Sequence, residues 1–112
     1  MRLPRGSDAV VDLAKLREYV LNPLHPRRKH KARVFASALQ IHQADTEFLG
    51  QQLAEAAASG DSVIGERDQY GQRYILDFDC MRGTHRATVR SGWIVFTGEG
   101  FPRLTTCYVL SE

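Results

Sequence analysis

The sequence predicts an α+β fold in which two to three N-terminal helices pack on a four-stranded antiparallel meander sheet. Apolar residues recur at helical spacing through the first half of the chain, and near Ser62 the period changes to two, which is typical of strands. Short turn segments separate the strands, so sequence neighbours are expected to pair antiparallel. Helices that precede such a sheet must cover one of its faces. We therefore expect two layers, with the other face of the sheet partly exposed.

The chain has 112 residues, of which 43% are hydrophobic, and this is enough for a single core. We expect residues 1–8 to form a flexible N-terminus and residues 9–112 to form one globular α+β domain. The sequence has no apolar run of the roughly 18 residues that a bilayer span needs, and its N-terminus lacks the apolar core of a secretion signal. The expected localisation is cytoplasmic, without a membrane partner.

Three helices are expected in the first half of the chain. Asp12 is placed to cap the first, over about residues 13–21, and the Asn22-Pro23 step ends it because a residue before proline avoids the helical region. A second helix follows His25-Pro26 and runs to about residue 40. A third is expected from 45–46 to 59–60, where a Ser-Gly pair stops it.

Four strands are expected after residue 60. Residues 62–67 form a short first strand, alternation over 73–80 and 87–95 gives two longer ones around a turn at 81–84, and a loop at 97–102 leads to the last. In this last strand we expect one face to carry Leu104, Thr106, Tyr108 and Leu110. The Ser91-Gly92 pair interrupts the third strand and suggests a β-bulge.

One hydrophobic core should collect the apolar positions of these elements. We expect large buried side chains at Phe35, Leu49, Leu53, Trp93 and Leu104. The two cysteines lie in strand-like runs and are too few for a disulfide framework, so they are interpreted as buried free thiols.

Charge is distributed unevenly, although the formal net charge is only +2. Residues 27–33 contain five Lys or Arg, one His and no acid, whereas residues 45–68 carry six carboxylates against one Arg. Cations at the start of a helix oppose its macrodipole, which suggests that an anion such as phosphate binds there. The alternative is a solvated helix face that is balanced by an acidic helix elsewhere.

Several sequence motifs resemble those of a family of small bacterial proteins of unknown function. The motifs are LREYVLNPLHP at 16–26, KHKARVF at 29–35, YGQRYILDF at 70–78, VRSGWIV at 89–95 and PRLTT at 102–106. The resemblance covers about residues 9–110. Members of that family place a glycine shortly after the His-Pro pair, where this chain has Arg27 and Arg28. The resemblance implies no activity, but some relatives stand beside small partner genes and others end larger toxin polypeptides.

The order of helices followed by a meander also resembles the ribonuclease toxins grouped around barnase, the EndoU nucleases, colicins E and D, and RelE. This second resemblance is one of architecture and residue type, and fold does not fix function. It implies metal-independent RNA cleavage by transesterification. In that reaction a base takes the proton of the 2′-hydroxyl, an acid protonates the departing 5′-oxygen, and cations stabilise the charge on phosphorus.

The chain has residue types suited to each of these roles. Either imidazole would act as base or acid near neutral pH, one lysine and two arginines would hold the phosphate, and a threonine hydroxyl would donate to a phosphate oxygen. The candidate catalytic residues are His25, His30, Lys31, Arg90, Arg103 and Thr106. For each of them the competing interpretation is an ordinary surface or capping side chain.

Other kinds of site are not indicated. The two candidate histidines have no nearby Cys or acid to complete a metal site, and no phosphate-cradling glycine motif is present, so no metal and no cofactor are expected. Three strand aromatics, Tyr74, Trp93 and Tyr108, would stack on nucleobases if exposed, although strand aromatics usually lie in the core.

Two hypotheses from different classes remain open. The first is a small RNA-cleaving toxin whose partners are RNA and a small inhibitor protein. The second is a non-catalytic binding module, either antitoxin-like or an adaptor, whose basic face docks an acidic partner. They differ in whether His and Lys from the helical half converge in one cleft with Arg and Thr from the sheet.

Overall fold

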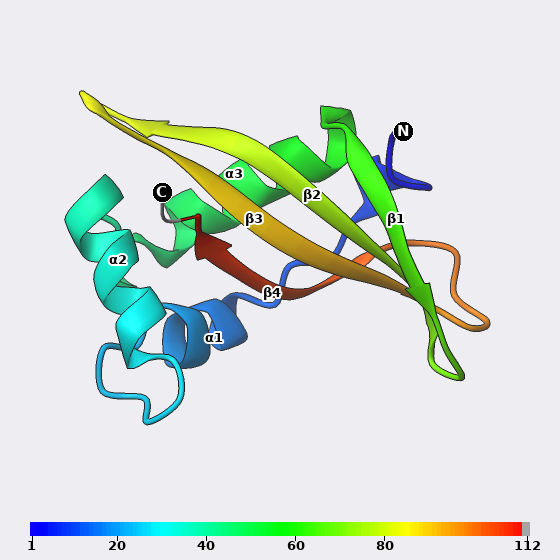
Figure 1. Cartoon of the computed structure of the whole chain (residues 1–112), viewed down its shortest axis with the longest axis horizontal. Helices are drawn as coiled ribbons and strands as arrows, with labels where there is room; N and C mark the ends of the chain where they lie inside the picture. The colour runs from blue at the N-terminus through cyan, green and yellow to red at the C-terminus, as the bar shows by residue number, and fades with distance from the viewer. Residues whose placement is uncertain (111–112) are drawn as a thin grey trace.

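A computed structural model describes residues 1–110 and places all the helices ahead of the strands in the chain (Figure 1). The helices are α1 (Leu13–Lys15), which continues as one π-helical turn (Leu16–Val20), α2 (Lys29–Leu39) and α3 (Thr46–Ser59), with short 3₁₀ turns at Gly6–Asp8 and Gln43–Asp45. These positions agree with the three expected helices. None of the helices in the described part of the chain is long and apolar enough to cross a membrane.

The strands β1 (Ser62–Arg67), β2 (Gly71–Arg82), β3 (His85–Phe96) and β4 (Arg103–Val109) form one antiparallel sheet in the order β1-β2-β3-β4. The expected α+β fold with a four-stranded meander is therefore confirmed. In Figure 1 the helices lie on one side of this twisted sheet, and the C-terminal end of β4 points toward α2.

Local side-chain chemistry sets the ends of the first helical segment. The carboxylate of Asp12 accepts hydrogen bonds from the backbone N–H groups of Ala14 and Lys15 at 3.0 and 3.2 Å, as the sequence predicted. At the other end, the side chain of Asn22 donates to the carbonyl of Glu18 and accepts from the N–H of Leu24. The chain therefore leaves the helix in a defined direction before residue 25.

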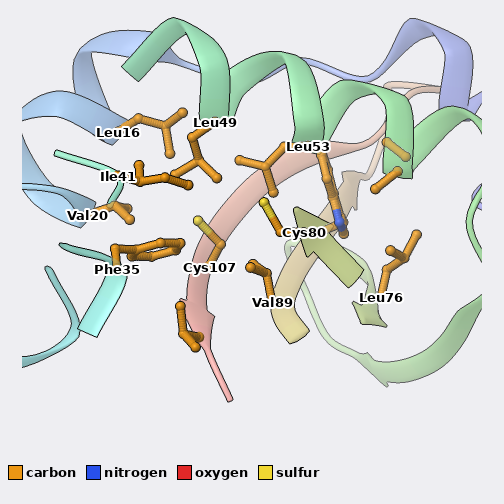
Figure 2. Close-up of a cluster of buried hydrophobic side chains, with 14 of the residues drawn as sticks. Leu16, Val20, Phe35, Ile41, Leu49, Leu53, Leu76, Cys80, Val89 and Cys107 are labelled. Atoms are coloured by element: carbon orange, nitrogen blue, oxygen red, sulfur yellow. The ribbon is translucent and has the colours of Figure 1, made fainter. Parts of the chain in front are cut away.

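The core fills the space between the helices and the sheet (Figure 2). Phe35, Leu49 and Leu53 are fully buried, and Trp93 is 1% exposed, as expected. The indole N–H of Trp93 donates to the hydroxyl of Ser91 at 2.8 Å, and that hydroxyl donates to a backbone carbonyl of β2 at 2.6 Å. The one tryptophan of the chain is thus packed without an unsatisfied donor.

Both cysteines are free and buried in this core, as the sequence predicted. Burial raises the pKa of the Cys107 thiol to about 12, because the surrounding apolar side chains disfavour a thiolate. Neither thiol is therefore placed as a nucleophile.

A β-bulge lies where β3 meets β4, next to the predicted Ser91-Gly92 pair. Gly92 pairs with Thr106 and Trp93 pairs with Leu104, so the extra residue is Thr105 in β4, and β3 itself is continuous. The expectation that Leu104 shares a face with Thr106 and Tyr108 is wrong, because the extra residue returns Leu104 to the core side. There Leu104 is partly buried against the core cluster.

The N-terminal segment lies against the rest of the fold. Residues 1–8 were expected to be flexible; Leu3 within them is 4% exposed, and the terminal ammonium pairs with Asp61. Further along, Val10 forms a parallel bridge to Arg103, donating to the carbonyl of Pro102 and accepting from the N–H of Leu104. This bridge covers part of the outer edge of β4.

Candidate functional site

Arg28 joins the basic segment to the last strand. It directly precedes α2, which starts without a side-chain cap and has no acid in its first turn. Its guanidinium donates from Nη1 to the hydroxyl of Thr106 at 3.1 Å and from Nη2 to the carbonyl of Cys107 at 2.8 Å. Its Nε is buried without a hydrogen-bond partner among the described residues. These contacts hold the start of α2 against β4.

A hollow of about 340 Å³ lies beside this contact. Its lining residues are Lys15, Tyr19, Val20, Arg28, Thr105 and Thr106. The lining contains two cations, two hydroxyls and a phenol, and it contains no carboxylate. Such a set of donors matches an anion with several oxygen acceptors, of which phosphate is the common biological example.

His25 stands next to the hollow. Its ring packs on that of Tyr19 with the ring centroids 4.4 Å apart and the planes tilted by 39°. Its Nδ1 accepts a hydrogen bond from the backbone N–H of Arg27 at 3.1 Å. Because Nδ1 is an acceptor here, the neutral ring carries its proton on Nε2, which can then donate.

A second hollow, of about 290 Å³, follows the first along β4. It is lined by His30, Lys31, Val34, Tyr108, Val109 and Leu110. The ammonium of Lys31 lies 4.2 Å from the centroid of the Tyr108 ring. Thr106 and Tyr108 lie on the same outer face of β4, and two residues of strand correspond to roughly 7 Å. The two hollows are therefore neighbours, and they bring His30, Lys31 and Thr106 to one region.

Arg90 lies on β3 opposite Tyr108 but is already paired. Its Nε and Nη2 donate to the two carboxylate oxygens of Asp77, each at 2.9 Å. This carboxylate, together with a contact to the hydroxyl of Tyr108, holds the pKa of the Arg90 guanidinium above its ordinary value. The side chain is fixed in place beside Tyr108, with its charge balanced.

Arg103 is also paired and lies at the other end of β4. Its guanidinium donates to both carboxylate oxygens of Glu99, at 2.8 and 3.0 Å, and lies 5.1 Å from the ring centroid of Phe101. The carboxylate raises the pKa of Arg103 above its ordinary value. Arg103 lines neither hollow, so the structure does not bring it together with His25 or Lys31.

The cations of the two halves of the molecule differ in their partners. Within residues 1–110, each of the five arginines of β2, β3 and β4 forms an ion pair with a carboxylate. The helical half carries cations without such a pair in the same range, namely Arg2, Lys15, Arg17, Arg27, Arg28, Lys29, Lys31 and Arg33. In the sheet, Arg67 of β1 is also without an ion pair in this range. The described residues hold no cluster of three or more His, Cys, Asp or Glu placed for a metal ion.

Sequence reasoning missed three of the residues around the first hollow, namely Lys15, Tyr19 and Arg28. Two signals pointed to them. Lys15 and Tyr19 are four residues apart and so share one helix face, and Arg28 stands where the sequence resemblance leads to the expectation of a glycine. Neither signal shows that a strand more than 70 residues away in the sequence supplies the opposite wall.

The fold and this site define a small α+β domain with a cationic, hydroxyl-lined surface between α2 and β4. The chain belongs to the family described as Domain of unknown function (DUF6883), whose model matches residues 2–111. The resemblance to a family of unknown function is thus confirmed. No curated protein matches the chain.

One solved structure has a similar fold. It is a chain of a contact-dependent growth inhibition toxin–immunity protein complex from Klebsiella pneumoniae 342. The TM-score is 0.71 and the sequence identity is 18%, and the match covers 96% of this chain and 97% of that one. At this identity the match shows a shared fold along nearly the whole length of both chains.

Proposed function

We propose that this chain is a toxin-like domain that cleaves RNA by metal-independent transesterification. The observation that carries the proposal is the first hollow, where Arg28 is anchored to Thr106 and the cations have no carboxylate partner among the described residues. A surface of this kind suits a phosphodiester, because unpaired cations and hydroxyls gain partners when the anion binds.

The chemistry divides between the two hollows. The phosphodiester lies against Lys15, Arg28 and Thr106 in the first hollow. A base removes the proton of the 2′-hydroxyl, the 2′-oxygen forms a bond to phosphorus, and the bond from phosphorus to the 5′-oxygen breaks. We assign the acid and the base to His25 and His30: one imidazole takes the proton of the 2′-hydroxyl, and the other, as the imidazolium, gives a proton to the 5′-oxygen. In His25 the reacting nitrogen is Nε2, because Nδ1 accepts a hydrogen bond from the N–H of Arg27. Lys31 adds a second cation near the charge that develops on phosphorus.

In this proposal Arg90 and Arg103, which are paired with carboxylates, do not bind the phosphate. Arg90 lies opposite Tyr108 in the strand register and therefore stands beside a wall of the second hollow. Arg103 is held by Glu99 at the start of β4, where the bulge at Thr105 sets the direction of the strand. Both act by positioning β4 and its side chains, with their charges balanced by Asp77 and Glu99.

The fold comparison supports a toxin-like or an immunity-like role. The similar chain comes from a complex of a growth inhibition toxin with its immunity protein, and such a complex contains a protein partner for the toxin. For this chain we propose a small inhibitor protein that covers the basic surface between α2 and β4. Acidic groups on that inhibitor would pair with the unpaired cations of residues 27–33.

The direct test is cleavage of RNA by the purified protein in the presence of a chelator. Total tRNA and ribosome-bound mRNA should be cut, and mass spectrometry should find a 2′,3′-cyclic phosphate on the upstream fragment. Cleavage that required a divalent metal ion would contradict the mechanism. Absence of cutting, together with normal growth of cells that express the protein, would contradict the proposed function.

Single substitutions test which side chains take part in RNA cleavage. His25→Ala and Lys31→Ala should abolish cutting and leave the fold intact, since neither side chain is part of the core. Arg67→Gln is the matched control, because Arg67 is an exposed cation of β1 without an ion pair in residues 1–110. It should cut RNA at the rate of the unchanged protein. Equal losses in all three variants would show that only total charge matters.

The second candidate is a binding protein of the antitoxin or immunity type, and one observation favours it. The edge strand β1 exposes Val63 and Ile64, at 66% and 57%, which is the kind of edge that pairs with another chain. If RNA is not cut, the His25→Ala and Lys31→Ala variants should instead weaken the capture of an acidic protein partner.

A further inference from the structure

We infer that the second hollow is a nucleobase subsite, in which the base on the 5′ side of the scissile phosphate stacks on Tyr108. The inference rests on the proposed function for the identity of the ligand as RNA. It adds that the chain selects the nucleotide to be cut and assigns this selection to named residues.

The first observation is which aromatic side chain the fold leaves available. Of the three strand aromatics considered from the sequence, Trp93 is 1% exposed and Tyr74 is 7% exposed, and both are packed in the core. Tyr108 lies on the outer face of β4, half-buried, and lines the second hollow. Of these three rings, Tyr108 is therefore the one that a base can reach.

The second observation is what surrounds the Tyr108 ring. Val34, Val109 and Leu110 give the hollow apolar walls. The ammonium of Lys31 lies 4.2 Å from the ring centroid and has no carboxylate partner in the described part of the chain. Because the lysine stem is flexible, this ammonium can move from the ring to a carbonyl or ring nitrogen of an incoming base. The hollow thus offers a π-face, apolar walls and one mobile donor, which is the set that recognises a base.

The third observation is the distance to the phosphate site. Thr106 and Tyr108 are separated by two residues of extended strand, roughly 7 Å, on one face of β4. A ribose links a base to its 3′-phosphate over a similar length. A base on Tyr108 therefore places its own 3′-phosphate at Arg28 and Thr106, and it places its 2′-hydroxyl between the two hollows, near Lys31.

The subsite also has a fixed frame. Arg90 is the cross-strand partner of Tyr108, and its guanidinium donates two hydrogen bonds of 2.9 Å to the carboxylate of Asp77. A stacking platform needs a ring that does not rotate away when the ligand binds. The Asp77 and Arg90 pair supplies this restraint from the neighbouring strands β2 and β3.

The test measures binding without cleavage. The four ribonucleoside 3′-monophosphates and ribose phosphate, which lacks a base, are titrated into the protein and followed by NMR shifts of the backbone amides of Thr106 and Val109, which are present in the unchanged protein and in every variant. The unchanged protein should bind at least one nucleotide more tightly than ribose phosphate by about fivefold or more. In Tyr108→Leu this preference should disappear while the affinity for ribose phosphate stays the same.

Tyr70→Leu is the matched control. Tyr70 is 58% exposed and lies in the turn between β1 and β2, at the opposite end of the sheet from α2 (Figure 1). This variant should keep the full preference for nucleotides. An unchanged preference in Tyr108→Leu, or no preference in the unchanged protein, would overturn the subsite.

The two proposals can fail separately. A preference for nucleotides that depends on Tyr108, in a protein that cuts no RNA, would uphold the subsite and reject the proposed cleavage. Cleavage whose choice of nucleotide is the same in Tyr108→Leu and in the unchanged protein would reject the subsite alone.

Discussion

Strands β2, β3 and β4 and the basic segment 27–33 carry the same kind of side chain in different electrostatic settings. On the sheet, Arg73, Arg82, Arg86, Arg90 and Arg103 each have a carboxylate partner. In the basic segment no Lys or Arg has one within the described residues. Asp77 stands opposite Arg90 and Asp79 near Arg86 in the strand register, whereas the other three carboxylates, Asp45, Asp68 and Glu99, come from turns and loops outside the strands.

This difference separates cations whose charge is already balanced from cations that, in the proposed function, bind the phosphodiester. A guanidinium held by a bidentate carboxylate gains little from a phosphate, since the carboxylate must first be displaced. An unpaired cation at the start of α2, where the macrodipole is also positive, gains a partner. Four predictions test the comparison, from the largest expected effect to the smallest.

Removing the anchor of α2 should have the largest effect. Phe35 is fully buried and lies on the inner face of α2, opposite the exposed cations. Phe35→Ala should lower the free energy of unfolding by about 3–5 kcal/mol, measured by urea denaturation. Val34→Ala, at a half-buried position of the same helix, is the control with a smaller expected loss. An unchanged melting temperature in Phe35→Ala would show that α2 is held by its charged side instead.

Arg28 is the exception within the basic segment, because it also serves the fold. Arg28→Met removes two hydrogen bonds of a cation to Thr106 and the Cys107 carbonyl, and should cost about 2 kcal/mol. Arg27→Met, at the exposed neighbouring position, should leave the stability unchanged. Urea denaturation of both variants measures the difference. Equal stabilities would mean that Arg28 does not dock the segment on β4.

A pH titration tests whether the ion pair between Arg82 of β2 and Asp45 of the helical half stabilises the fold. A hydrogen bond from Arg82, and a second from the backbone N–H of His42, lower the pKa of Asp45 from 3.8 to about 2. The carboxylate therefore adds stability above about pH 4, and this is lost as the pH falls through 2; we expect about 1 kcal/mol. Asp45→Asn should show a smaller loss of stability between pH 4 and pH 2. An identical pH profile would reject the pair as a stabilising contact.

The smallest effect is expected from the exposed sheet pairs. Arg86 pairs with Asp79, and both side chains are more than half exposed, so Arg86→Gln should leave the melting temperature and the salt dependence of RNA binding unchanged. Lys29→Gln, which removes an unpaired cation, should reduce the slope of log K against log salt by about 0.7. Equal slopes of log K against log salt in the two variants would contradict the distinction between paired and unpaired cations.

Most of the fold was predictable from local patterns. The three helices, the four strands and the turn before His85 follow from apolar period, caps and turn residues. The bulge was expected in β3 at Ser91-Gly92, and it lies instead in the facing strand β4 at Thr105. The face predicted for Leu104 was wrong because the extra residue Thr105 reverses the inward and outward alternation of side chains along β4. The sequence of β3 gives no sign of a bulge in the strand that pairs with it.

The candidate site was predictable only in part. The basic segment, His25 and Thr106 stood out by residue type, and they lie together around the first hollow. The carboxylate partners of Arg90 and Arg103 could not be predicted from residue type. Asp77 reaches Arg90 because the two residues are opposite each other in neighbouring strands, and Glu99 reaches Arg103 from the loop before β4. Arg28 was passed over as one surface charge among five.

The sequence by itself determined the elements, their order, the two-layer architecture and the excess of cations before α2. These features depend on side chains a few residues apart, so their physical causes are present in any short stretch of the chain. The tertiary structure decided which cations are paired, which aromatic side chain remains accessible and that Arg28 meets β4 beside the first hollow. These outcomes depend on contacts between residues far apart in the sequence, whose partners are chosen only when register and packing are complete.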